Sequence, residues 1–225
     1  MLAQLLQKYP NFYPVVPFDW QSDNFLVLDF TENNTELKTV NLLDTEQFNN
    51  YISQKLQENK AKVGVGGYNE NRFIYNRSEH FQQENEPRSI HLGIDIWAIA
   101  GTEICSPLDG IVHSFQNNET FGDYGPTIIL EHEIQNQKFY TLYGHLSLES
   151  LEGKSVGQKI EKGQIFASFG NFPINGNWPP HLHFQIVENI EQNFGDYPGV
   201  CTISKRDYFL KNCPNPNLIL RILNI

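Results

Sequence analysis

The stretch His181-Leu182-His183-Phe184-Gln185-Ile186 decides how this chain folds and where its chemistry lies. Its apolar and β-branched residues favour a β-strand. Successive side chains of a strand point to opposite faces of the sheet, so residues two apart share a face. The two imidazoles, His181 and His183, are therefore expected on the same face of one strand.

Other short strand patterns surround this stretch between residues 90 and 188. They cover residues 94–97, 110–115, 127–132, 139–143 and 165–169, separated by loops rich in Gly, Pro and Asn. The polar pair Asn136-Gln137 lies between two of these strands, which favours a hairpin. The pattern predicts a mainly β protein, with a barrel- or sandwich-like core and one or two helices outside it.

The chain divides near residue 62. Residues 1–62 are rich in Asn and Gln and carry none of the motifs below, so we expect a small N-terminal α/β extension followed by a domain over residues 63–225. Within the extension, Phe48, Ile52 and Leu56 recur every four residues, which predicts a helix over 45–60 capped by Thr45. At the other end we expect a short helix over 204–212, capped by Ser204, and an apolar strand over 218–225.

Charge and hydropathy exclude several classes of partner. The 225-residue chain has a formal net charge of −10, which argues against binding nucleic acid or an anionic membrane. No apolar run approaches the roughly 18 residues that span a bilayer. We see no signal peptide, and the odd number of cysteines, three, favours reduced thiols. We therefore predict a cytoplasmic protein; the alternative is an exported one whose leader has been removed.

Four of the seven histidines stand in settings typical of a metal site. His91 precedes Asp95 by four residues, and the intervening Gly93 lets the backbone bend so that both side chains converge. His145 follows a strand pattern directly. A catalytic zinc site needs three protein ligands and one open position, although each of these motifs alone is weak.

Taken together, the motifs resemble the lysostaphin-type zinc metallopeptidases, also called the peptidoglycan endopeptidase or autolysin-type family. The order His91 to Asp95, Tyr143-Gly144-His145-Leu146, His181-Leu182-His183-Phe184 matches that family. So do the strand start at residues 105–112 and the glycine-containing hairpin at 156–165. The resemblance covers roughly residues 88–188.

The resemblance implies a set of roles. The metal ligands fall on His91, Asp95 and His183, holding one zinc per chain, and the catalytic histidines fall on His145 and His181. It also implies an antiparallel β core with the site in a groove, and hydrolysis of a peptide or amide bond by metal-activated water. The substrate would be a peptidoglycan-type peptide or a small intracellular molecule, because the flanks of this chain differ from those of wall hydrolases.

Two arginines are candidate substrate ligands. Both are notable in so acidic a chain: Arg72 and Arg88. Arg88 lies three residues before His91, and an arginine there is suited to a substrate carboxylate. The alternative for each is a structural salt bridge. Three histidines have no partner motif and are expected to be structural or exposed: His80, His113 and His132.

Two other functions remain open at this point. One is a non-catalytic module that keeps the fold and binds a peptide or protein partner. The other is a lipoyl- or phosphocarrier-like β module, for which Lys162 is the nearest candidate attachment residue, although Lys162 is better explained as a turn residue. Metal content distinguishes all three.

Overall fold

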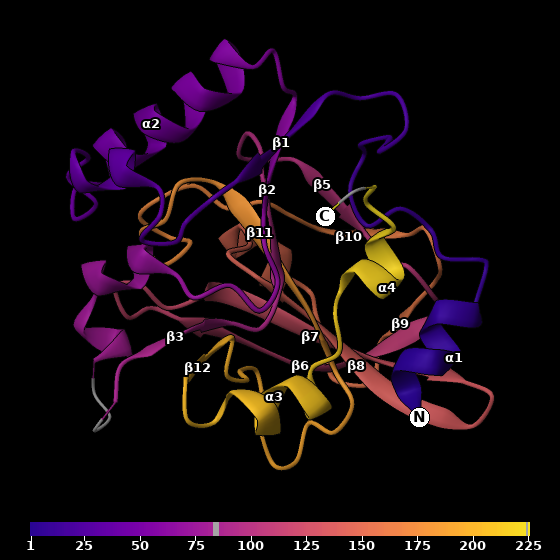
Figure 1. Ribbon diagram of the computed structural model, residues 1–225. Helices are drawn as coiled ribbons and strands as arrows, with labels where there is room; N and C mark the ends of the chain where they lie inside the picture. Colours follow the sequence, from indigo (N-terminus) through magenta and orange to yellow (C-terminus); the bar gives the residue numbers. More distant parts are fainter. Residues whose placement is uncertain (83–85, 224) are drawn as a thin grey trace.

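The computed structural model describes residues 1–82, 86–223 and 225 (Figure 1). The α-helices are α1 (Leu2–Lys8), α2 (Thr45–Glu58), α3 (Arg206–Asn212) and α4 (Asn217–Leu220). Short 3-10 turns cover η1 (Thr35–Lys38), η2 (Phe73–Arg77), η3 (Glu79–Phe81) and η4 (Leu148–Leu151). The strands are β1 (Phe25–Leu28), β2 (Val63–Gly66), β3 (Arg88–His91), β4 (Ile94–Trp97), β5 (Glu103–Cys105), β6 (Gly110–Asn118), β7 (Gly125–Ile134), β8 (Gln137–Gly144), β9 (Lys159–Ile160), β10 (Ile165–Ser168), β11 (His181–Val187) and β12 (Val200–Thr202).

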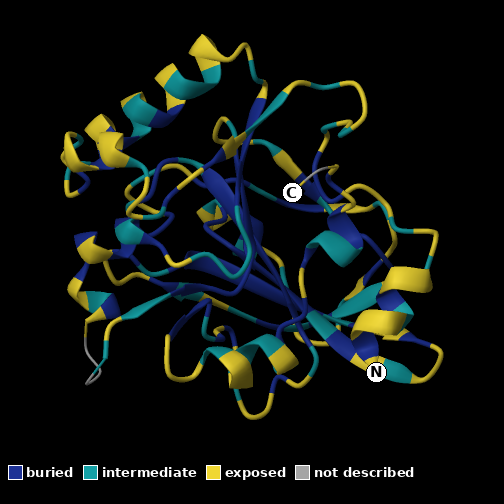
Figure 2. Cartoon of the chain, viewed as in Figure 1, coloured by how far each residue is buried: buried dark blue, intermediate teal, exposed yellow. Residues whose placement is uncertain are grey.

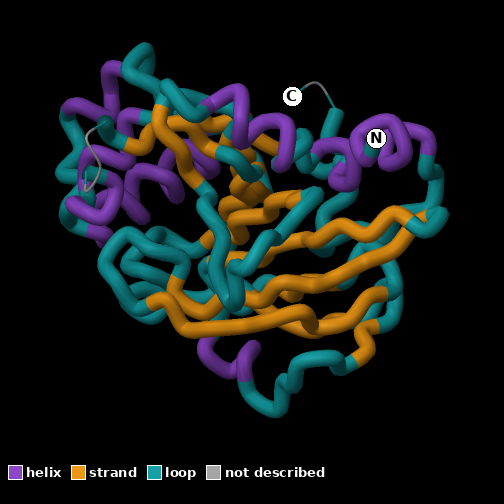
Figure 3. Tube along the Cα trace, turned by 90° about the horizontal axis from the view of Figure 1, so that it is seen from below, coloured by secondary structure: helices purple, strands orange, loops and turns teal. Residues whose placement is uncertain are grey.

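An eight-stranded sheet forms the centre of the molecule, in the order β1-β2-β4-β11-β8-β7-β6-β9. Its neighbouring strands run antiparallel except for β1 and β2, which are parallel. Two small sheets, β10-β5 and β12-β3, accompany it. Figure 3 shows the strands as a stacked layer with the helices around its margin. The mainly β prediction is confirmed, and the sheet is open, because β1 and β9 end it without pairing to each other.

The hairpin between β7 and β8 turns one residue earlier than the sequence pattern indicated. Its two central residues are Gln135 and Asn136, with φ of 52° and 62°, and β8 already begins at Gln137. Two positive φ angles in a two-residue loop are the geometry that matches the twist of the flanking strands. Asn136 tolerates that conformation better than most residues, which fixes the position of the turn.

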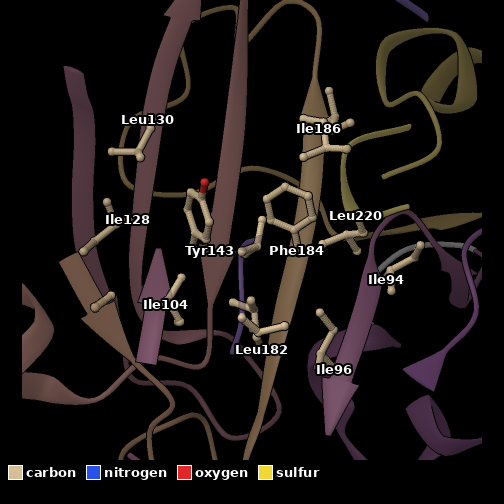
Figure 4. Packing of buried hydrophobic residues seen from close by; sticks show 14 of the residues in the cluster. Ile94, Ile96, Ile104, Ile128, Leu130, Tyr143, Leu182, Phe184, Ile186 and Leu220 are labelled. Carbon is tan, nitrogen blue, oxygen red and sulfur yellow. The ribbon is translucent and has the colours of Figure 1, made fainter. Parts of the chain in front are cut away.

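The two faces of the central strands differ in chemistry. Ile94 and Ile96 of β4, with Leu182, Phe184 and Ile186 of β11, belong to the largest apolar cluster. Figure 4 shows these side chains packed side by side with those of the neighbouring strands. The intervening residues of the same two strands point the other way, and they include every site residue that these strands contribute.

The first 62 residues pack on both sides of this sheet. Leu2, Leu6 and Val15 join the largest apolar cluster, while Phe48 and Ile52 of α2 join a second cluster that also holds Trp97 and Trp178. Figure 2 shows the outer side of α2 exposed and its inner side buried. Whether this segment folds as a separate unit stays a prediction.

Helix α2 confirms the predicted helix, with a different cap. Asp44 is the N-cap, and its carboxylate accepts from the backbone N–H groups of Glu46 and Gln47, as short polar side chains do at that position. Thr45 is instead buried, and its hydroxyl donates to the carbonyl of Asn177 at 2.9 Å. Thr45, which the local pattern assigned to the cap, therefore makes a tertiary hydrogen bond instead.

Of the two elements predicted near the C-terminus, the helix is present and the strand is not. Helix α3 is present, but it begins after Lys205 without a side-chain cap, so Ser204 is not its cap. The strand predicted over 218–225 is wrong, because Asn217–Leu220 form helix α4. Pro216 precedes it, and proline favours a helix start; the single turn buries Ile219 and Leu220. No helix in the described part of the chain is long and apolar enough to cross a membrane.

Candidate metal centre

The short connection between β3 and β4 brings His91 and Asp95 together. His91 is fully buried, and its Nδ1 lies 2.8 Å from the carbonyl oxygen of Gly67, so Nδ1 carries the proton. Its Nε2 then offers a lone pair, 3.2 Å from Oδ1 of Asp95. A Cβ on Gly93 would come within 2.5 Å of the His183 ring. Gly93 is thus needed for room beside the third histidine, beyond the bend expected from the sequence.

The register of the sheet places His183 of β11 directly opposite Asp95 of β4. Its Nδ1 lies 3.1 Å from Oδ1 of Asp95, and its Nε2 lies 2.8 Å from Oε1 of Gln185. The Gln185 amide donates to the carbonyl of Pro198 at 3.1 Å, which turns its oxygen toward the histidine. Gln185 therefore keeps the His183 proton on Nε2 and the lone pair on Nδ1. The sequence analysis missed it, although its place two residues after His183 on the same face was a usable signal.

Three electron-pair donors converge without a proton between them. His91 Nε2 and His183 Nδ1 are 2.9 Å apart, and both lie near Oδ1 of Asp95. Tetrahedral zinc with bonds of 2.0–2.1 Å requires donor separations of about 3.3 Å. Three acceptors this close repel one another unless a cation lies between them. Within the described residues, this trio is the only His, Cys, Asp and Glu group of metal-binding size, and it fits a zinc ion.

Arg72 fixes the other side of the Asp95 carboxylate. It is almost fully buried and donates from NH1 to Oδ2 of Asp95 and from Nε to Glu70 at 2.7 Å. Burial alone would raise the pKa of Asp95, but His91 and Arg72 outweigh it and hold the pKa well below its usual value. This geometry favours the salt-bridge alternative for Arg72, and its role as a substrate ligand stays a prediction.

His145 and His181 form a second pair of imidazoles beside the donor trio, with ring centroids 4.1 Å apart. His145 directly follows β8 with φ of 62°, and its Nδ1 lies 2.8 Å from the carbonyl of Asn175. The Nδ1 of His181 lies 2.8 Å from the carbonyl of Pro179, and its ring stacks on Trp97 at 3.9 Å. Both rings therefore carry the proton on Nδ1 and present a lone pair on Nε2.

The environment keeps both of these rings neutral. Burial lowers the pKa of His181 to about 4. Burial, followed by the neighbouring His181, lowers the pKa of His145 well below its usual value. A neutral imidazole with a free Nε2 is able to accept a proton, which is what general base catalysis requires.

Asp95 and His183 of the donor trio line one cavity of about 110 Å³ together with this pair, and His91 lies buried behind them. Among its other walls are Tyr75, Tyr124 and Trp178, which the sequence analysis did not single out. No strand motif marked them, since they come from loops and a 3-10 turn whose position depends on the fold. No residue of the first 62 lines this cavity, so in the described structure that segment contributes packing rather than cover.

The other singled-out residues are divided between the cavity and the surrounding structure. Arg88 lines the cavity and donates to the carbonyl of His80; its role toward substrate stays a prediction. His80 lines the cavity as well, although no role was expected for it. His132 has both ring nitrogens bonded, to Asp109 O at 2.9 Å and Thr141 Oγ1 at 2.8 Å, in line with the structural role expected for it.

Several solved structures are similar to parts of this chain. Similar solved structures include a mutant catalytic domain of the prophage-encoded M23 protein EnpA from Enterococcus faecalis (24% identity over 45% of this chain and 70% of that chain, TM-score 0.36). Others are a zinc-containing peptidase from Vibrio cholerae (27% identity, 44% of this chain and 27% of that chain, TM-score 0.33) and the catalytic domain of lysostaphin from Staphylococcus simulans (23% identity, 54% of this chain and 80% of that chain, TM-score 0.36).

No curated protein gave a significant match. The model of Peptidase family M23 matches residues 89–194, a range that contains the donor trio and both neighbouring histidines. Residues 89–194 thus match peptidase family M23, in agreement with the resemblance to the lysostaphin-type metallopeptidases.

Proposed function

We propose that this protein is a zinc-dependent hydrolase of peptide or amide bonds, with one zinc held by His91, Asp95 and His183. The convergence of three proton-free donors on one point carries the proposal. Each donor is held in that state by a neighbour on its far side: a backbone carbonyl, a glutamine oxygen or a guanidinium. Such outer partners fix the orientation and the tautomer of metal ligands.

The metal ion and the side chains around it have separate roles in the proposed hydrolysis. A zinc ion at this point supplies Lewis-acid chemistry, polarising a carbonyl and acidifying water. His145 and His181 hold neutral Nε2 lone pairs toward the same cavity, so that either can accept a proton from attacking water and then, as an imidazolium, donate a hydrogen bond to the developing charge. Arg72 keeps Oδ2 of Asp95 occupied, so that Oδ1 stays directed at the histidines.

The substrate follows from the family and from the size of the cavity. Members of peptidase family M23 act on peptides, and we propose either a peptidoglycan-type peptide or a small intracellular peptide or amide. A cavity of about 110 Å³ is below the roughly 300–1,000 Å³ of sites that enclose a drug-sized ligand. Only the reacting end of a substrate fits inside. Action in the cytoplasm stays a prediction.

Metal analysis and hydrolysis together test the proposal. Purified protein should contain one zinc per chain, and it should cleave a peptide from a panel of glycine peptides and cell-wall fragments. Chelation should abolish cleavage and zinc should restore it. Protein that holds zinc but cleaves nothing in the panel, while binding one of its peptides, would support a non-catalytic binding module instead. Absence of any divalent metal would refute the proposed site.

A further inference from the structure

One end of the catalytic cavity carries charges that the metal chemistry does not use. Asp123, Asp196 and Arg88 line it, together with His80. They come from three separate parts of the chain: the loop before β7, the loop before β12 and the first residue of β3. The fold thus brings two carboxylates and one guanidinium to the cavity that holds the proposed zinc ligands.

These charges lie close together without neutralising one another. Burial raises the pKa of Asp196, Asp123 raises it further, and Arg88 acts in the opposite direction. Among the described residues, however, no salt bridge joins Arg88 to either carboxylate. The side chain paired with Asp123 is that of His80, whose Nε2 lies 3.9 Å from Oδ1 of Asp123, and burial lowers the pKa of His80 and so favours its neutral form. Arg88 itself donates to a backbone carbonyl and lies over the ring of Phe81 at 5.4 Å.

A metal ion does not explain the group. In the described part of the chain, the donor atoms of Asp123, Asp196 and His80 do not converge as those of the proposed zinc ligands do. The wall beside them is aromatic, and it includes Trp178, which is 3% exposed. The indole N–H of Trp178 is buried and has no hydrogen-bond partner among the described residues. A buried donor without a partner in a cavity wall is an independent sign of a polar ligand.

We propose that Asp123, Asp196 and Arg88 form a subsite that binds a free α-amino-acid group of the substrate. The two carboxylates receive the ammonium, and the guanidinium receives the carboxylate on the same carbon. This arrangement matches the mixed charge of the group, since an amine alone leaves Arg88 unpaired and a carboxylate alone leaves both aspartates unpaired. Charge-assisted hydrogen bonds of this kind are among the stronger polar contacts in proteins.

The subsite defines the substrate class of the proposed hydrolase, and it rests on that proposed function. The substrate is an amide formed through an amino-acid side chain, because only then do a free ammonium and a free carboxylate remain on one carbon; this zwitterionic end enters the small cavity while the bond to be cleaved lies at the zinc. An ordinary linear peptide carries its free ammonium and its free carboxylate at opposite ends and has no such group. The subsite therefore predicts action at the end of a substrate rather than in its interior.

Calorimetric titration with glycine tests the subsite apart from hydrolysis. Glycine should bind, and it should bind both zinc-loaded and chelator-treated protein, because the subsite lies beside the metal ligands and does not include them. N-acetylglycine, which lacks the ammonium, and glycine ethyl ester, which lacks the carboxylate, should each bind about tenfold or more weakly. Glycine binding that disappears on chelation would show that glycine is a zinc ligand only and would overturn the subsite.

Isosteric variants complete the test. Asp196→Asn and Asp123→Asn should weaken glycine binding about tenfold or more, and Arg88→Gln should do the same, with zinc content unchanged. Asp207→Asn, an exposed carboxylate on α3 outside the cavity, is the matched control and should bind like the parent. Asp196 lies in a loop outside the helices and strands, so its variant should fold even if Asp123→Asn does not.

The subsite is wrong if glycine fails to bind at tens of millimolar, or if Asp196→Asn binds it as the parent does. Loss of cleavage with glycine binding intact would instead count against the proposed hydrolase and leave the subsite standing. The two proposals therefore fail in distinguishable ways.

Discussion

The two faces of strands β4 and β11 share one backbone and have opposite chemistry. On one face Ile94, Ile96, Leu182 and Phe184 are buried in the apolar core (Figure 4). On the other, the alternate residues supply a carboxylate and two imidazoles to a polar cavity. The same register positions both sets. The apolar face holds the strands rigidly in place, and that rigidity gives the polar face donor separations near 3 Å.

A histidine on the apolar side sharpens the contrast. His132 of β7 shares its face with Leu130, which belongs to the apolar core, and both of its ring nitrogens are bonded within the protein. Each of the four histidines of the site, His91, His145, His181 and His183, bonds one nitrogen to the protein frame and directs the other toward its neighbours at the site. Burial alone therefore does not distinguish a structural histidine from a chemical one; the direction of the second nitrogen does.

The largest effect is expected where the polar face loses a ligand. His183→Ala should lose the zinc and all measurable hydrolysis, because two protein ligands hold zinc far more weakly than three. Elemental analysis and a hydrolysis assay check this. Circular dichroism should show the parental fold, since Phe184 and Leu182 still anchor the strand. A variant with full zinc content would remove His183 from the ligand set.

A substitution on the apolar face should lower the stability of the protein and leave metal binding intact. Phe184→Ala removes a fully buried ring and should lower the free energy of unfolding by about 3–5 kcal/mol. The folded fraction should still bind one zinc per chain, because the ligand atoms lie on the opposite face. Denaturant unfolding with parallel metal analysis measures both quantities. Equal stability in variant and parent would show that this face does not anchor the site.

The second pair of histidines separates metal binding from catalysis. His145→Ala and His181→Ala should each keep the zinc but lose roughly a hundredfold in kcat, the usual loss when acid–base assistance is removed. Activity and zinc content are compared with those of His113→Ala, whose ring is outside the cavity lining and whose variant should match the parent. Parental turnover in either site variant would mean that its imidazole has no catalytic part.

The smallest predicted effect belongs to His132. Burial lowers its pKa to about 4, so the folded protein keeps it neutral while the unfolded chain protonates it below about pH 6.5. The unfolded state then binds more protons, and the stability that His132 contributes is full above pH 6.5 and falls as the pH drops toward 4. Between about pH 7.5 and pH 5 the loss is about 2 kcal/mol.

His132→Gln isolates that loss. The variant should be less stable at neutral pH, but it should lose about 2 kcal/mol less than the parent when the pH falls to about 5. Chelator-treated samples remove the contribution of the metal from the comparison. An identical pH dependence in parent and variant would show that His132 is not held neutral by the fold.

Local patterns in the sequence predicted much of the fold and of the candidate site. Alternation along 181–186 predicted a strand with both imidazoles on one face, and the structure places His181 and His183 so. Four-residue spacing predicted α2. The same approach failed over 218–225, where apolar residues indicated a strand and the chain forms α4. A short apolar run suits either element, and its packing partners, which lie far away in the sequence, decide between them.

The outer partners of the site could not be predicted. Gly67, Gln185 and Pro198 orient the ligand atoms, and two of them act through backbone carbonyls that any residue supplies. Arg72 was a candidate substrate ligand because of its charge, but its contact with Asp95 depends on how residues 67–75 turn back over β4. Such contacts leave no periodic signal, because their spacing is set by the path of the loop.

By itself, the sequence determined the mainly β architecture, the order of the motifs and which side chains share a face, because the two-residue period of a strand is a local property of the backbone. The tertiary structure alone decided which nitrogen of each histidine meets the others, that two aspartates and an arginine line the same cavity, and that no residue of the N-terminal segment lines it. These depend on strand register and loop path, which are settled by the burial of apolar surface across the whole chain.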